Sequence, residues 1–150
     1  MSVAFRRDSD EEHREPRFEL PIPPGPNLVT QRGLELIRAR IAELEAALAA
    51  AEGDAREAIG RDLRYWRTRG VTAVVAPPPP ADAVGFGSAV AVHMPAGERR
   101  YRIVGDDEAD PAAGLLAWSA PLAKVLMGAM AGERLAWGGK PDALEVLSVG

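Results

Sequence analysis

The chain has no cysteine, only two histidines, and few aromatic residues, which make up 5% of its 150 positions. Without cysteine, disulfide frameworks and thiolate chemistry are excluded, and a reducing compartment is the natural setting. The N-terminus has no apolar signal core, and no apolar run approaches the roughly 20 residues that span a bilayer. A net charge of −4 argues against a dominant polyanion-binding surface. We therefore expect a small cytoplasmic protein of one or two domains with no membrane partner.

Residues 1–27 combine a dense run of charges with four prolines between positions 21 and 26. Such a segment buries too little apolar surface to offset the entropy lost on ordering. The sequence predicts a mostly disordered tail over 1–27. The alternative is that the apolar residues Phe18, Leu20 and Ile22 pin the tail to the rest of the protein.

Residues 28–76 carry two helical patterns separated by Gly53. The first has apolar residues spaced alternately three and four apart, the seam of a coiled-coil helix: Leu34, Ile37, Ile41, Leu44 and Leu48. Thr30 stands where an N-cap is expected, and Ile59, Leu63 and Trp66 continue the pattern after Gly53. The spacing predicts an antiparallel helical hairpin, whose seam closes within one chain or between two.

Residues 77–83 begin with a stiff proline run and form the expected linker to a domain over 84–150. Five short strands are predicted there: Ala89–His93, Arg99–Val104, Leu115–Trp118, Arg134–Trp137 and Leu144–Val149. A helix with Ser119 as N-cap and Pro121 in its first turn should run to about Gly132. The predicted fold class is α+β, a helical hairpin followed by an antiparallel sheet with one short helix on its face.

An acidic turn follows the second of these strands. Asp106, Asp107, Glu108 and Asp110 place four carboxylates in five positions. They cannot share a buried site without a large pKa cost, so the turn should be solvated or face a basic partner. A metal site is the disfavoured alternative, because no histidine or cysteine stands nearby. We therefore predict no metal and no cofactor.

Several short motifs occur in one order along the chain: Tyr101-Arg-Ile-Val-Gly105, Asp107-Glu-Ala-Asp110, Ser119-Ala-Pro-Leu-Ala-Lys124 and, near the start, Asn27-Leu-Val-Thr-Gln-Arg-Gly-Leu34. Together they resemble the GreA/GreB transcription elongation factors over everything but the charged tail. The resemblance implies an FKBP-like C-terminal domain that docks on the largest subunit of RNA polymerase, at the rim of the secondary channel. It also implies a coiled coil inside the channel, with two tip carboxylates that help hold the polymerase Mg²⁺ during transcript cleavage. That chemistry belongs to the polymerase, so the factor itself is not an enzyme.

The hairpin turn departs from the family pattern. Asp54 and Glu57 match the two tip carboxylates, but Ala58, Gly60 and Arg61 replace other signature residues, and Arg56 would compete with a metal. Each arm is about ten residues shorter than in the cleavage factors, which at the helical rise removes ~15 Å of reach. The alternative role for Asp54 and Glu57 is helix capping and stabilisation of the helix dipole.

The resemblance also assigns partner contacts. Pro121 and Leu122 match the docking residues, Ser119 stands where aspartate is usual, and Asp107, Glu108 and Asp110 would add electrostatic steering. Pro121 and Leu122 are equally explained by helix initiation and core packing. Arg61, Arg64 and Arg67 recur every three residues and would line the channel wall or contact nascent RNA, or else form a solvated face.

The short hairpin is similar to that of the regulators of nucleoside diphosphate kinase and the Gre-like inhibitors. The sequence thus predicts a transcription factor that occupies the channel and modulates elongation without full cleavage stimulation. An active cleavage factor using Asp54 and Glu57 is the first alternative. A peptidyl-prolyl isomerase, with a pocket built from Tyr101, Trp118 and Trp137, is an alternative from another class, as is an interaction module that acts through the tail.

Overall fold

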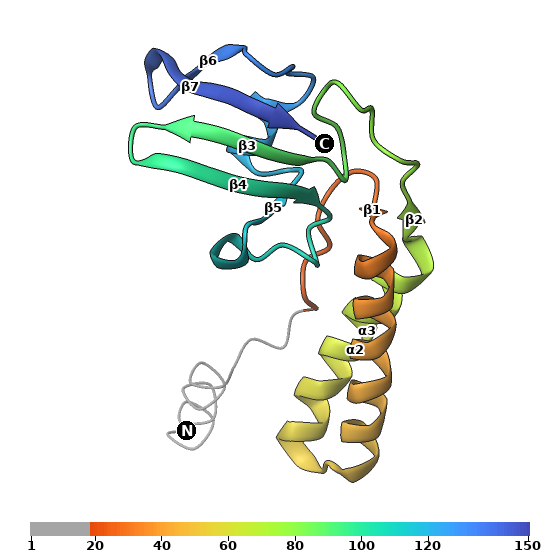
Figure 1. Cartoon of the computed structure of the whole chain (residues 1–150). Helices are drawn as coiled ribbons and strands as arrows, with labels where there is room; N and C mark the ends of the chain where they lie inside the picture. The colour runs from red at the N-terminus through yellow and green to blue at the C-terminus, as the bar shows by residue number, and fades with distance from the viewer. Residues whose placement is uncertain (1–18) are drawn as a thin grey trace, which may run out of the picture.

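The computed structural model describes residues 19–150, in which a helical hairpin stands beside a sheet domain (Figure 1). This arrangement confirms the α+β fold class. For residues 1–18, the prediction of a mostly disordered tail lies outside the described residues. None of the helices in the described part is long and apolar enough to cross a membrane.

The hairpin consists of α2 (Gln31–Ala50) and α3 (Gly53–Thr72), which are 20 residues each and therefore about 30 Å long. Thr30 is the N-cap of α2, as predicted, and its hydroxyl oxygen accepts a hydrogen bond from the backbone N–H of Gly33 at 2.9 Å. The two helices pack against each other within the chain, and Ile37, Leu44 and Leu63 are buried between them. The seam therefore closes within one chain.

Two short strands that the sequence did not predict join the base of the hairpin. β1 (Leu28–Val29) precedes α2, β2 (Val74–Val75) follows α3, and the two pair in parallel. Backbone hydrogen bonds of 2.9 Å from Val74 to Asn27 and 3.0 Å from Ala76 to Val29 close the ladder. The hairpin is thus tied together at the end that lies next to the sheet domain (Figure 1).

The sheet domain has five strands: β3 (Ala89–Met94), β4 (Gly97–Val104), β5 (Leu115–Ala117), β6 (Arg134–Trp137) and β7 (Lys140–Val149). Their order is β5-β4-β3-β7-β6. Three neighbouring pairs are antiparallel, but β4 and β5 are parallel, so the sheet is mixed and the prediction of a wholly antiparallel sheet was wrong. The acidic turn and a short 3₁₀ helix, η1 (Pro111–Ala113), lie between β4 and β5 and return the chain to the same direction.

A single short helix, α4 (Pro121–Leu126), completes the core of this domain. Leu122, Ala123 and Leu126 from α4 are buried with strand residues such as Val92 and Ile103. Pro121 begins the helix as predicted, but the predicted end near Gly132 was wrong. The backbone leaves the helical conformation at Met127, and Gly128 has a φ of +82°, which favours glycine.

Candidate functional site

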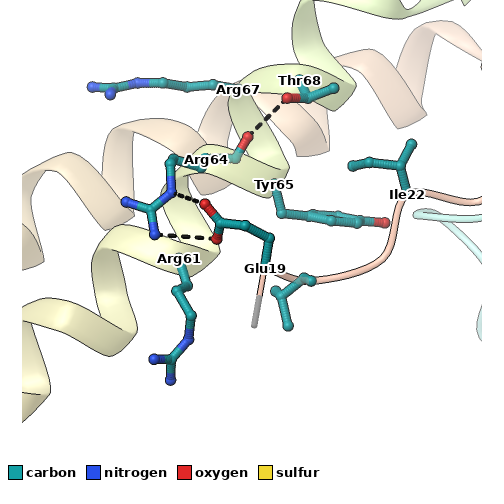
Figure 2. Close-up of a pocket in the computed structure, with 8 residues that line it drawn as sticks. Glu19, Ile22, Arg61, Arg64, Tyr65, Arg67 and Thr68 are labelled. Carbon is teal, nitrogen blue, oxygen red and sulfur yellow. Dashed lines mark hydrogen bonds and ion pairs between the residues drawn. The ribbon is translucent and has the colours of Figure 1, made fainter. Parts of the chain in front are cut away.

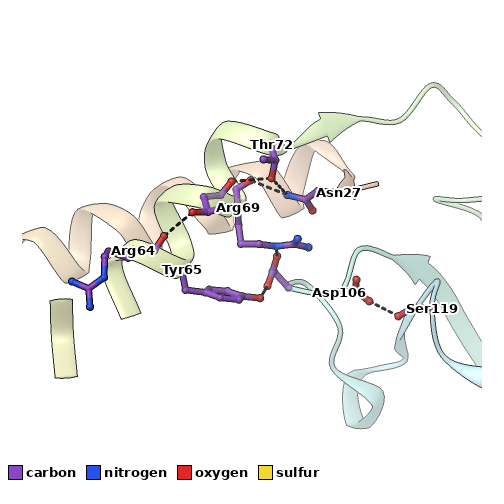
Figure 3. Close-up of polar contacts among 9 residues, drawn as sticks. Asn27, Arg64, Tyr65, Arg69, Thr72, Asp106 and Ser119 are labelled. Atoms are coloured by element: carbon purple, nitrogen blue, oxygen red, sulfur yellow. Dashed lines mark hydrogen bonds and ion pairs between the residues drawn. The ribbon is translucent and has the colours of Figure 1, made fainter. Parts of the chain in front are cut away.

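The acidic turn after β4 forms the contact between the sheet domain and the hairpin. The side chain of Asp107 is only 7% exposed, accepts a hydrogen bond from Arg69 Nε at 2.5 Å, and accepts another from the hydroxyl of Tyr65 (Figure 3). Both partners are on α3. The sequence left open whether the turn is solvated or faces a basic partner; Asp107 faces one, and that partner belongs to the same chain.

Glu108 makes the matching contact with α2. Its carboxylate accepts hydrogen bonds from Thr30 Oγ1 at 2.6 Å and from Arg32 at 2.9 Å, and the side chain is 3% exposed. The carboxylate also lies against the first turn of α2, where a negative charge favours the helix dipole. Gly33 leaves room for it, because a Cβ there would lie 2.9 Å from Glu108 Oε1. Asp107 and Glu108 together hold both helices, and we call these contacts the base latch.

Arg69 is the residue that sequence reasoning missed. Its side chain is 2% exposed, although arginine is rarely buried unless it is paired. Its backbone carbonyl also accepts a hydrogen bond of 2.8 Å from the side chain of Asn27, which is itself buried (Figure 3). A signal was present in the sequence: Tyr65 and Arg69 are four residues apart on α3, so they share a face that a carboxylate can contact.

The hydroxyl of Tyr65 gives the base latch a measurable pH dependence. Burial, together with the hydrogen bond to Asp107, raises the pKa of Tyr65 to about 12. A pKa raised on folding adds stability that is fully present below the unfolded pKa of about 10 and is lost as pH rises towards 12. We expect the thermal midpoint of the wild type to fall over this alkaline range more than that of Tyr65→Phe.

Ultraviolet titration of tyrosinate checks the same prediction, because the chain has only two tyrosines. The step with a midpoint near pH 12 should disappear in Tyr65→Phe, whereas Tyr101→Phe should retain it. A wild type without the step near pH 12 would contradict the buried hydrogen bond of Tyr65.

The tip carries the two carboxylates that the resemblance singled out. Asp54 and Glu57 lie exposed in the first turns of α3, at the end of the hairpin far from the sheet (Figure 1). Arg56 turns back to α2 and donates a hydrogen bond of 2.6 Å to the backbone carbonyl of Leu48. Within residues 19–150 no cluster of three or more acidic, histidine or cysteine side chains is placed to hold a metal ion.

The predicted docking residues divide into buried and exposed ones. Leu122 is 8% exposed and belongs to the core, whereas Pro121, Ser119 and Asp110 are exposed. The prediction that Ser119 is the N-cap of α4 was wrong, because Ala120 takes that position. The Ser119 hydroxyl instead donates a hydrogen bond to Asp106 (Figure 3). Asp110 directly precedes η1, Ser119 lies in the loop before α4, and Pro121 is the first residue of α4.

Of the three arginines that the sequence grouped into one stripe on α3, Arg64 and Arg67 pair with different carboxylates. Arg64 makes a two-pronged contact with the carboxylate of Glu19, and Arg67 pairs with Glu45 of α2 at 2.9 Å. Together with Arg61 they line a groove of about 420 Å³, which is also lined by Leu20, Ile22, Tyr65 and Thr68 (Figure 2). Hydrogen bonds from Arg64 hold the pKa of the Glu19 carboxyl below its usual range.

The aromatic residues that an isomerase would need are used in packing. Tyr101, Trp118 and Trp137 are partly buried and pack against the core of the sheet domain. Trp118 also makes an edge-on contact with Phe86 at a ring-centroid distance of 6.4 Å. These contacts give the three side chains a structural role.

The sequence of the sheet domain matches a known family. Residues 79–150 match the model described as "Transcription elongation factor, GreA/GreB, C-term". This is a family of transcription factors, not of classical enzymes. A search among curated proteins gave no significant match.

Among solved structures, three similar chains are less than 20% identical to this one. The GreA factor homolog 1 (Gfh1) of Thermus thermophilus is 16% identical, with 84% of this chain and 99% of that chain covered and a TM-score of 0.38. A GreA/GreB factor from Nitrosomonas europaea is 19% identical over 81% of this chain and 97% of its own, with a TM-score of 0.40. Gfh1 of Thermus aquaticus is 17% identical over 83% of this chain and 97% of its own, with a TM-score of 0.38. The family model thus relates residues 79–150, which contain the sheet domain, to the C-terminal domain of the GreA/GreB transcription elongation factors.

Proposed function

We propose that this protein binds RNA polymerase at the rim of the secondary channel and modulates elongation without full stimulation of transcript cleavage. The observation that carries the proposal is a helical hairpin fixed by the base latch to a domain of the GreA/GreB C-terminal family. A hairpin held to the docking domain by a buried ion pair, Arg69 with Asp107, keeps one direction relative to it. It therefore enters a channel as a rigid rod of about 30 Å.

The tip supports modulation more than cleavage. Asp54 and Glu57 are the two tip carboxylates that match the family pattern, and they belong to the first turns of α3, where acidic side chains already favour the helix dipole. Arg56 is committed to the end of α2 and adds positive charge close to them. With arms of 20 residues, the pair stops short of the polymerase metal if the domain docks as the family resemblance implies.

The docking surface is proposed to lie around the start and end of α4. Pro121 and Ser119 are exposed at its start, Asp110 is exposed in the preceding loop, and Met127 follows its end with 37% of its surface exposed. Exposed apolar side chains beside polar ones are typical of protein interfaces. Leu122 supports this surface from the core beneath it.

Direct binding to core RNA polymerase from the same organism tests the proposal. We expect Met127→Glu to weaken binding at least about tenfold, because an interface would bury the new charge without a partner. Leu147→Glu is the matched control, since Leu147 is similarly exposed, at 41%, but lies on β7. No binding by the wild type, or equal losses in the two variants, would contradict the proposed surface.

The groove on α3 is the second contact that we propose. Arg61, Arg64 and Arg67 lie along about 9 Å of the helix, and arginine binds phosphate groups through the same planar fork that binds carboxylates. In the channel, nascent RNA is the nearest source of such phosphates. This contact would give the factor weak, salt-dependent affinity for single-stranded RNA.

A further inference from the structure

The first described residues of the chain cross the outer face of α3. Residues 19–26 have no regular secondary structure, and we call them the strap. At one end of the strap, the Glu19 carboxylate meets Arg64, and at the other end the chain continues into Asn27, whose side chain is hydrogen-bonded to Arg69 O and Thr72. In Figure 2 the side chain of Glu19 points from the strap toward Arg64, and the side chain of Arg61 lies nearby.

Glu19 binds Arg64 in the way that a phosphate group would. One carboxylate oxygen accepts a hydrogen bond from Arg64 Nε and the other accepts one from Arg64 Nη2 at 3.1 Å. Both donors on this edge of the guanidinium are therefore used. Arg61 adds a further attraction to the same carboxylate. A phosphate oxygen pair has a closely similar shape and charge, and arginine uses the same two donors for it.

The contact is also weak enough to be displaced. Both side chains are more than half exposed, at 58% for Arg64 and 60% for Glu19, and exposed ion pairs contribute little to stability because solvent screens them. Leu20 and Ile22 line the groove but remain 40% and 45% exposed, so they add little burial that would hold the strap in place. A polyanion that presents several phosphates competes easily with one carboxylate.

We propose that the strap is an autoinhibitory cover of the α3 groove, in which Glu19 occupies the place of an RNA phosphate and must leave before RNA binds Arg64. This inference rests on the proposed RNA contact of the arginines. An acidic protein segment would need the same groove, but the three arginines in a short stripe favour a phosphodiester chain, because it carries one charge on every nucleotide. The strap therefore lowers the affinity of the α3 groove for RNA.

The test is binding of the full chain to a fluorescently labelled single-stranded RNA at low salt, without polymerase, measured by anisotropy. Glu19→Gln removes the competing charge and should tighten binding up to about fivefold, the ceiling set by an exposed ion pair. Arg64→Met should weaken binding. In the double variant the gain from Glu19→Gln should vanish, because the two side chains act through each other.

Glu43→Gln is the matched control. It removes one negative charge and one exposed ion pair, with Arg40, but it lies on α2 outside the groove. Equal gains in Glu19→Gln and Glu43→Gln would show a general charge effect and overturn the inference. If Arg64→Met weakens RNA binding but Glu19→Gln leaves it unchanged, the autoinhibitory role of the strap is overturned, while the proposed RNA contact of Arg64 is still supported. No binding by any form, or no effect of Arg64→Met, would overturn both.

Discussion

Arg69→Ala is expected to lower the free energy of unfolding by about 3–5 kcal/mol, the usual cost of leaving one member of a buried ion pair without its partner. Asp107 would keep only the hydroxyl of Tyr65 as a partner while remaining 7% exposed. Since domains of this size are stable by only about 5–15 kcal/mol, much of the total would be lost. Denaturant unfolding, with separate probes for the helices and the sheet, measures it.

Arg67→Ala is the control, because it removes an arginine of the same helix that pairs with Glu45 at the surface. Its cost should stay below about 1 kcal/mol. Replacing the whole pair in Arg69→Met with Asp107→Leu should recover much of the loss, since no buried charge is then left unpaired. Equal, small effects of Arg69→Ala and Arg67→Ala would show that the base latch does not hold the hairpin.

Gly105→Ala is expected to destabilise the protein by at least about 2–3 kcal/mol, because overpacking a closed contact forces the backbone to move. A Cβ at Gly105 would lie 2.5 Å from the backbone oxygen of Leu28 in β1. The end of β4 and the base of the hairpin therefore approach each other through a position that tolerates no side chain. Thermal and denaturant unfolding measure the change.

Gly60→Ala provides the opposite expectation on the same chain. Gly60 lies inside α3, and a Cβ there meets only the flexible end of Arg64, at 3.4 Å. Alanine is better than glycine in a helix by about 1 kcal/mol, so this variant should be more stable than the wild type. If Gly105→Ala were as well tolerated as Gly60→Ala, the close contact between Leu28 and Gly105 would be ruled out.

The helices and most strands could be predicted because their signals are local. The spacing of Leu34, Ile37 and Ile41 fixes one helical face, and Thr30 marks where the helix begins. Gly97 begins β4, just after the turn that joins β3 to β4. Such signals depend on neighbours within one or two turns of the chain, so one sequence suffices to read them.

Long-range pairings explain what the sequence did not reveal. The β1–β2 ladder joins Leu28 to Val74, and each strand has only two residues, too few for a periodic pattern. The parallel pairing of β5 depends on the path of the acidic loop, not on the strand itself. Arg69 was not singled out by the sequence because its partner, Asp107, lies 38 positions away.

The candidate site was therefore predictable in parts. The sequence singled out Asp107 and Glu108 and required either solvent or a basic partner for them, but it could not say that α2 and α3 supply that partner. It listed Arg64 among three similar arginines, whereas the structure sets it apart through Glu19. The roles proposed for Asp54 and Glu57 stay predictions.

Transcript cleavage by stalled, backtracked complexes of the cognate polymerase, measured with and without this protein, tests the central claim most directly. We predict that the wild type binds these complexes, leaves the cleavage rate near that of polymerase alone, and slows cleavage when a full-length cleavage factor competes with it. Asp54→Ala should behave like the wild type, because we expect the tip carboxylates to stop short of the metal. Cleavage stimulated by the wild type and abolished by Asp54→Ala would contradict the account and make this protein a working cleavage factor.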